Sequence, residues 1–257
     1  MQGYDRENFA RLIFDKQYEQ AMELAKNSHK ETEPFSSENL YSLVDAHALW
    51  RSLYPNDRSW DAIFSSQYIK HYRYGKIGGF RIDEINKKLT ELCQEIGYTE
   101  NPREHLDIAG ENKLIITDQD IPTDLPEIIA LKATASEIYE DYVSTILRLG
   151  YPRYRVREIA RQRLFAAATR SDGFHPPHLH SNATFVMTYY FQVPAESRTK
   201  LQFGKHNLIQ STPFHEVVPE TGDFFIFPSC YMHGTTKAET KALRANLGFE
   251  FEPVPQS

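Results

Sequence analysis

The chain has 257 residues, of which 40% are hydrophobic and 25% charged, a composition that excludes a disordered or fibrous protein. The net charge of −6 argues against a dedicated nucleic-acid binder, since such proteins usually carry a basic surplus. The apolar runs are too short for a transmembrane helix, and the N-terminal MQGYDRENFA has no apolar signal core. Two cysteines, Cys93 and Cys230, are too few for a disulfide framework. We therefore expect a reducing, cytoplasmic setting without membrane or nucleic-acid partners.

The first segment, residues 1–65, has a helical pattern. Apolar residues such as Leu12 and Ile13 recur every three to four positions, and Ser36 is a favoured residue at the start of a second helix. The segment fits a helical cap on the main domain, and one degenerate pair of tetratricopeptide helices is the alternative. We favour the cap.

The middle of the chain contains both strand and helix patterns. Residues 67–76 alternate well enough for a strand, and 113–117 predict a second, short one. Apolar spacing predicts helices over 80–97 and 126–148. The stretch 98–110 is rich in turn residues.

After residue 156 the chain consists of short β-rich runs separated by turns. Strands this short and this regularly spaced indicate an antiparallel sandwich or barrel. The sequence thus predicts an α+β protein, mainly β, with helices first and a β-core of about 100 residues after them. The predicted strands cover 163–169, 184–193, 201–203, 215–218, 224–227, 232–236 and 243–251.

Histidines gather between two of these strands. Six of the ten lie between positions 175 and 233, and the densest patch is GFHPPHLHSN at 173–182. Residues two apart in an extended chain point to the same side, so His178 and His180 can face one cavity, as metal ligands must. His175 stands three residues before His178, a spacing that suits a turn. An HxH pair alone is common by chance, so a metal site here requires further ligands from elsewhere in the chain.

A third histidine and an arginine lie farther along the sequence. His233 comes late in the run GDFFIFPSCYMHGT at 222–235, and Arg244 opens the apolar final strand. A buried arginine is unfavourable unless it meets an anion, and its planar guanidinium suits a carboxylate. Two near-adjacent histidines, a distant third and this arginine would hold a metal ion and, beside it, a small dicarboxylic acid.

The order HxH, His, then Arg on the last strand resembles the iron(II)- and 2-oxoglutarate-dependent oxygenases. The closest branch is the 2OG-Fe(II) oxygenase branch in which some members carry tetratricopeptide repeats. The resemblance covers roughly residues 75–252. Its motifs are DGFHPPHLHS at 172–181, MTYY at 187–190, LQFG at 201–204, and FPS with HGT within 227–235.

The resemblance implies a fold and an activity. The fold is a double-stranded β-helix (jelly-roll, cupin-like) domain over 66–257 with supporting helices, its core at about 156–252. The activity is that of a dioxygenase that uses Fe(II), 2-oxoglutarate and O2. Such an enzyme hydroxylates a small molecule or an amino-acid or peptide side chain and releases succinate and CO2.

The resemblance also implies roles for single residues. His178, His180 and His233 would bind the iron, and Arg244 would pair with the distal carboxylate of 2-oxoglutarate. Tyr190 lies an even number of residues after His180 and would point into the same cavity, where related oxygenases often use a tyrosine on that carboxylate. An ordinary core tyrosine is the alternative. Asn246 lies two residues after Arg244, and Asn182 lies two residues after His180. Each therefore shares a face with its neighbour and is a candidate to line the pocket.

The second ligand position departs from the general pattern of the family. That pattern is two histidines and one carboxylate, whereas His180 stands where Asp or Glu is expected. Three neutral imidazoles leave the Fe(II) centre at +2, and three histidines also suit zinc.

Two other functions are weighed against the oxygenase. One is a cupin-like three-histidine metalloenzyme without 2-oxoglutarate, which would have no need of Arg244. The other is a non-catalytic binding module that uses the N-terminal helices, which leaves the histidine set unexplained.

Overall fold

A computed structural model describes most of the chain from residue 65 onward. The described part is mainly β with two long helices, α4 (Ile82–Ile96) and α5 (Pro126–Arg148). The predicted helix at Ser36, and the choice between a helical cap and tetratricopeptide helices, lie outside the described residues. Within them, no helix is long and apolar enough to cross a bilayer. The described residues are 65–100, 114–117, 121–151, 153, 156, 158–169, 172–178, 180, 183–204 and 213–254, with scattered helical positions between 8 and 24.

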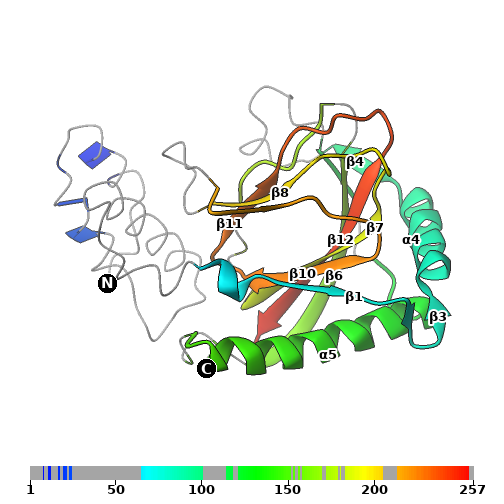
Figure 1. Cartoon of the computed structure of the whole chain (residues 1–257), viewed down its shortest axis with the longest axis horizontal. Helices are drawn as coiled ribbons and strands as arrows, with labels where there is room; N and C mark the ends of the chain where they lie inside the picture. Colours follow the sequence, from blue (N-terminus) through cyan, green and yellow to red (C-terminus); the bar gives the residue numbers. More distant parts are fainter. Residues whose placement is uncertain are drawn as a thin grey trace.

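The strands form a large and a small antiparallel sheet (Figure 1). The seven-stranded sheet has the order β1-β10-β7-β12-β6-β5-β4, and the three-stranded sheet has the order β11-β8-β9. The 3-10 turn η1 precedes β1, and a short hairpin, β2-β3, follows β1. The bounds are η1 Ser66–Tyr68, β1 Lys70–Arg73, β2 Lys76–Ile77, β3 Phe80–Arg81, β4 Tyr98–Glu100, β5 Leu114–Thr117, β6 Ile159–Thr169, β7 Phe185–Gln192, β8 Leu201–Gly204, β9 His215–Val217, β10 Asp223–Pro228, β11 Met232–Thr235 and β12 Arg244–Pro253.

The outer face of the large sheet packs against the two long helices. Side chains alternate between the two faces of a strand, and one set on β7 and β12 meets α5. Tyr142 packs edge-on against Phe185 at 5.1 Å between ring centroids, and Tyr139 stacks on Phe251 at 4.7 Å. Helix α4 is connected to β7 by a hydrogen bond that the Tyr189 hydroxyl donates to the side-chain oxygen of Asn86. The helices thus support the sheet from outside and leave its other face to the small sheet.

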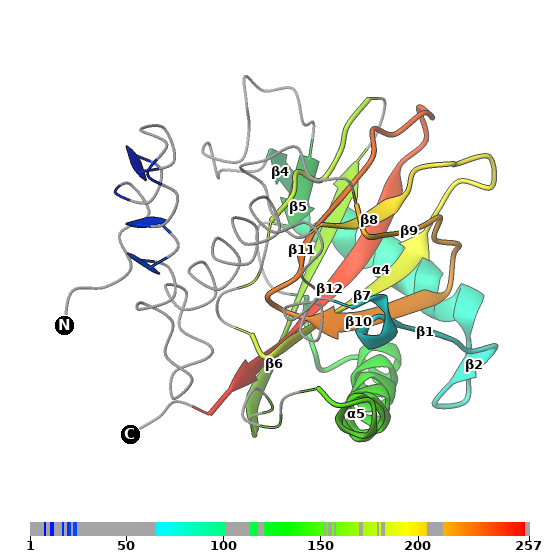
Figure 2. The same cartoon turned by 60° about the vertical axis from the view of Figure 1, so that its left-hand side comes forward.

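The inner face of the large sheet meets the small sheet. Phe203 of β8 lies 4.8 Å from Phe227 of β10, and the ring of His233 on β11 lies 4.7 Å from the same phenylalanine. In Figure 1 the strands β8 and β11 lie on the side of β10 opposite to α5. The strands β10, β7 and β12 are neighbours in the large sheet, and in Figure 2 the strands β8 and β9 lie above β10. A functional site between the two sheets is therefore bounded by β7, β10 and β12 on one side and by β11 on the other.

The predicted helices over 80–97 and 126–148 correspond to α4 and α5. The main chain of Arg81 donates to the Glu84 carboxylate (2.8 Å) at the start of α4, and Gly97 ends the helix with a positive φ of 84°. Pro126 stands in the first turn of α5, where its missing N–H is harmless.

Three sequence predictions need correction. The stretch 98–110 begins with a strand, β4, where turns were expected, because its residues pair with β5. The 67–76 segment is split into η1, β1 and β2. The picture of helices first and strands afterwards is incomplete, since β1, β4 and β5 from the first half of the chain all join the large sheet.

Candidate metal centre

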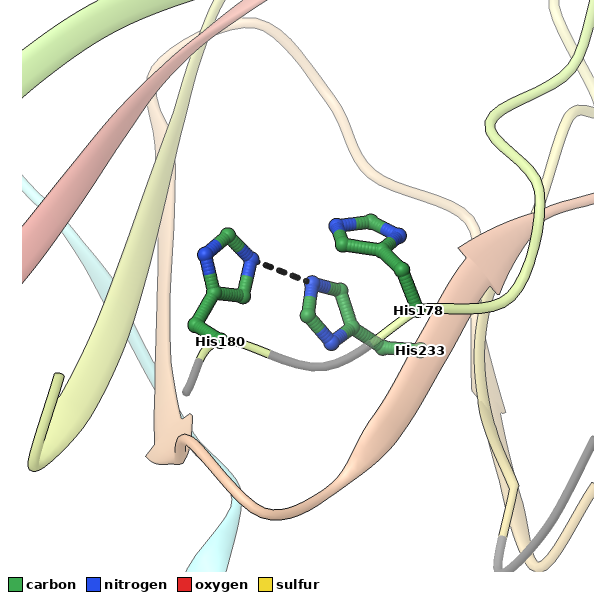
Figure 3. A group of neighbouring side chains, drawn as sticks. All are labelled: His178, His180 and His233. Atoms are coloured by element: carbon green, nitrogen blue, oxygen red, sulfur yellow. Dashed lines mark hydrogen bonds between the residues drawn. The ribbon is translucent and has the colours of Figure 1, made fainter. Parts of the chain in front are cut away.

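Three histidines from two segments of the chain, His178, His180 and His233, lie close together (Figure 3). The segment that carries His178 runs beside β11, where the main chains of His178 and His233 exchange two hydrogen bonds of 2.9 Å each. This bridge places His178 opposite His233. Two residues on, the main-chain N–H of His180 donates to Ser229 at 3.2 Å. The chain is thus held on both sides of the HxH pair.

The three imidazoles turn their Nε2 side toward one another. One ring nitrogen from each histidine lies within 4.8 Å of the others, and the Nε2 atoms of His180 and His233 are 3.3 Å apart. Every Nδ1 is engaged elsewhere, with an oxygen as acceptor. His178 donates to the Pro176 carbonyl (2.9 Å), His233 to the Tyr231 carbonyl (3.0 Å) and His180 to a carboxylate oxygen of Glu250 (2.6 Å). Partners of this kind fix the tautomer of metal-binding histidines and leave Nε2 free to bind a cation.

Burial keeps two of these rings neutral. It lowers the pKa of His178 well below its ordinary value, and the neighbouring His175, His233 and His180 lower it further. The pKa of His233 is lowered well below normal in the same way, by burial first and by His180 next. A neutral imidazole is the form that binds a metal ion, so these two rings are in the protonation state that a metal requires.

Glu250 is a site residue that the sequence analysis missed. It lies on β12 with its side chain 11% exposed, and its second oxygen faces Arg163 at 3.4 Å. Burial opposes ionisation, but hydrogen bonding and attraction from His180 and Arg163 hold the pKa of Glu250 below its ordinary value. The sequence contains a signal for this residue. Glu250 is an even number of residues after Arg244, so the two side chains share one face of the strand.

His175 is a fourth histidine at this site. Its ring stacks on that of His178, with 4.2 Å between centroids, and it lines the same pocket. The sequence places it in a turn and gives it no role. The His175 ring therefore forms part of the pocket wall beside the three histidines.

A pocket with about 430 Å³ of empty space, part of it open solvent, extends from the histidines along the inner face of the large sheet. Tyr190 and Asn246, two of the residues expected to line the cavity, do so. The side-chain amide of Asn246 donates to Thr188 at 3.0 Å, which fixes it in the wall. Asn182, the remaining candidate, lies outside the described residues.

Arg244 lies against Tyr190 and is 3% exposed. Its guanidinium carbon sits 4.7 Å over the centroid of the tyrosine ring. The Nε and Nη2 atoms of Arg244 have no hydrogen-bond partner among the residues that the structure describes. Burial raises the pKa of Tyr190, and the nearby guanidinium partly opposes this rise. Buried N–H donors without acceptors are unfavourable, so the arginine is suited to an anion that enters from the pocket.

Gly234 allows the two histidine segments to come this close. A Cβ at this position would lie 2.6 Å from the carbonyl oxygen of His175 and 3.0 Å from the nitrogen of Pro177, both main-chain atoms. We expect Gly234→Ala to push the segment off β11, destabilise the fold by about 1–3 kcal/mol and weaken metal binding. Thermal unfolding and metal titration would measure both effects.

Gly75 supplies the matched control for that substitution. It lies in the turn after β1, has no positive φ, and a Cβ there would meet nothing within 4 Å. Gly75→Ala should leave both measurements unchanged. Equal behaviour of the two variants would show that the close approach at Gly234 is unimportant for the site.

A comparison with family models gives one match, to the family described as "Putative 2OG-Fe(II) oxygenase", over residues 163–250. The match spans β6 to β12 and includes all three histidines, Arg244 and Glu250. This part of the chain, about a third of its length, is similar to the 2OG-Fe(II) oxygenase family. The resemblance noted in the sequence is thus confirmed. Fe(II), 2-oxoglutarate and O2 are the cofactor and co-substrates of the matched family.

Solved structures of similar shape include hydroxylases. A prolyl hydroxylase from Trichoplax adhaerens, in complex with a peptide fragment of the hypoxia inducible factor oxygen degradation domain, is 14% identical. The match covers 78% of this chain and 92% of that one, with a TM-score of 0.50. A Pseudomonas putida prolyl-4-hydroxylase is 16% identical over 84% of this chain and 100% of its own, with a TM-score of 0.49. No curated protein matches by sequence. The likeness to the Trichoplax enzyme shows that this chain shares its fold.

Proposed function

We propose that His178, His180 and His233 hold Fe(II), and that Arg244 together with Tyr190 binds the distal carboxylate of 2-oxoglutarate. Three convergent imidazole Nε2 donors fit a divalent transition metal, and the buried guanidinium fits a carboxylate. We further propose that the two facing sheets form a double-stranded β-helix, with the oxygenase domain over 66–257 and its core at about 156–252. The residues 1–65 are proposed to form a separate helical segment.

The observation that carries this proposal is that Nε and Nη2 of the buried Arg244 have no hydrogen-bond partner among the described residues. A three-histidine site that does not bind an oxo acid has no use for a buried cation with two unpaired donor atoms. Arg244 therefore favours 2-oxoglutarate over the cupin-like alternative, and the convergent triad favours an enzyme over a binding module. Asn246 is proposed to line the bound 2-oxoglutarate, because it is fixed in the pocket wall two residues from Arg244. Asn182 stays a prediction.

The proposed reaction is hydroxylation of an unactivated C–H bond with release of succinate and CO2. Bound Fe(II) would supply the activation of O2 that drives the decarboxylation of 2-oxoglutarate. The protein's own residues orient the 2-oxo acid between the triad and Arg244, and Phe165, Val186 and Phe227 give that pocket apolar walls. Such walls exclude water from the reacting centre.

A small molecule or an amino-acid or peptide side chain is the proposed substrate. The Trichoplax enzyme of similar fold is a prolyl hydroxylase in complex with a peptide fragment, which supports a peptide side chain. The cytoplasmic setting expected from the sequence stays a prediction.

Anaerobic titration of the metal-free protein with Fe(II), with and without 2-oxoglutarate, tests the proposal. We expect a visible metal-to-ligand charge-transfer band that appears only when both are present. Iron binding without the band would overturn the role of 2-oxoglutarate, and failure to bind iron would overturn the triad. Zn²⁺ run in parallel shows whether the three histidines prefer it, since three imidazoles also suit that ion.

A further inference from the structure

We propose that Glu250 is a positioning residue of the metal centre, and that through His180 it supplies the negative charge that a directly bound carboxylate supplies in a 2-His-1-carboxylate site. This inference rests on the proposed function. It assigns a role to a side chain that would not touch the metal, the substrate or 2-oxoglutarate.

The contact is short and shielded from water. The Nδ1 atom of His180 lies 2.6 Å from the Glu250 carboxylate, and the two side chains are 9% and 11% exposed. The Nδ1 partners of His178 and His233 are main-chain carbonyls, which carry no net charge. Among the three ligands, the histidine with a carboxylate partner is therefore the one that stands where the family pattern has its carboxylate.

The charge at the centre is set by this contact. Fe(II) with three neutral imidazoles carries +2, whereas two imidazoles and a carboxylate leave it at +1. A carboxylate on Nδ1 makes the imidazole more basic, and adding Glu250 to the count brings the centre back to +1. Because both side chains are nearly buried, this charge is less screened than it would be at the surface. Glu250 would thus place a carboxylate one contact farther from the metal than in a 2-His-1-carboxylate site.

Arg163 holds the other side of Glu250. Its Nη1 atom lies 3.4 Å from the second carboxylate oxygen, and its side chain is 37% exposed. The guanidinium carbon also sits 5.6 Å from the ring centroid of Phe165, which borders His180. Arg163 therefore orients Glu250 and withdraws part of its charge, so the two residues should act on the metal with opposite signs.

Strand β12 connects this support to the other end of the pocket. Arg244, Asn246, Gly248 and Glu250 alternate onto its inner face, which runs from the guanidinium of Arg244 to the triad. A Cβ on Gly248 would lie 2.7 Å from the Phe165 ring, so the absence of a side chain there makes room for the ring beside His180. One strand thus carries both the proposed 2-oxoglutarate anchor and the positioning carboxylate.

Glu250→Gln is the test, because the glutamine carbonyl can still accept the hydrogen bond from His180 while the charge is lost. Titration of the metal-free protein with Co²⁺ and with Fe(II) should show metal affinity about 10- to 100-fold weaker than wild type. At saturating Fe(II) and 2-oxoglutarate, the charge-transfer band should move to shorter wavelength, since a less electron-rich iron gives up an electron less readily. Glu250→Ala, which removes charge and hydrogen bond together, should weaken binding further.

Glu252→Gln is the matched control. Glu252 lies two residues along the same strand and pairs with Arg161 at 4.0 Å. This variant should keep wild-type affinity and band position. A second variant, Arg163→Met, removes the cation that draws charge from Glu250 and should move the band to longer wavelength.

The possible outcomes separate this inference from the proposed function. If wild type takes up no metal, both are overturned. If wild type binds metal and forms the band while Glu250→Gln matches it in affinity and wavelength, the role of Glu250 is overturned and the oxygenase site stands. If Glu250→Gln does not fold, Arg163→Met decides, and a band that is unmoved or shifted to shorter wavelength would overturn the inference.

Discussion

Replacing His233 with alanine is expected to abolish metal uptake and, with it, 2-oxoglutarate-dependent turnover. His233 is 8% exposed and shares the bridge with His178, and its Nε2 lies 3.3 Å from that of His180. Removing a partner of a metal ligand typically reduces affinity 10- to 100-fold, so removal of a ligand itself should reduce it by more than about 100-fold. Titration with Co²⁺, together with a succinate assay, measures both losses.

His215→Ala is the control for this change. His215 lies on β9 of the same small sheet, and its ring is 5.9 Å from Phe203, which also borders His233. It belongs to the histidine-rich region of the sequence and yet stands outside the triad. Metal affinity should be unchanged in this variant. If the two variants bind metal equally well, the triad is not the metal site.

The element pattern of the chain could be predicted where local chemistry decides it. Helix α5 has the predicted bounds because Pro126 favours its start and Gly150 follows its end with a φ of 90°. The place of β1 in the large sheet could not be predicted. The alternation over 67–76 marks a strand, but its partner is β10, about 150 residues away, and pairing over that distance leaves no local signal.

The residues of the candidate site could also be predicted only where the signal is local. His178 and His180 could be recognised because both candidate ligands lie in one short motif, and parity along a strand predicted that Tyr190 and Asn246 line the pocket. Glu250 was missed because its partner, His180, is 70 residues earlier, and a search for acids beside the HxH pair does not reach it. An acidic residue at an inward position of an apolar strand was the available signal, since such a group needs a buried partner.

Arg244→Met is expected to remove 2-oxoglutarate binding while the metal-free protein becomes no less stable. Two nitrogen atoms of this buried guanidinium are unpaired, which costs about 1–3 kcal/mol, and the stacking on Tyr190 returns about 0.5–2 kcal/mol. Methionine fills a similar volume without a charge, and such replacements of buried charges are often neutral or stabilising. The unfolding midpoint of the metal-free protein should therefore be unchanged or raised.

Loss of the guanidinium from a bound carboxylate should cost about 2–5 kcal/mol, which corresponds to an affinity for 2-oxoglutarate about 30- to 5,000-fold weaker. Fe(II) binding should be retained, because the triad is untouched. Arg161→Met, at a β6 side chain that is 60% exposed, is the control and should alter neither quantity. If Arg244→Met keeps wild-type affinity for 2-oxoglutarate, the anchor lies elsewhere. If Arg244→Met lowers the unfolding midpoint sharply, the arginine stabilises the fold, and its two unpaired nitrogen atoms are not evidence for an anion site.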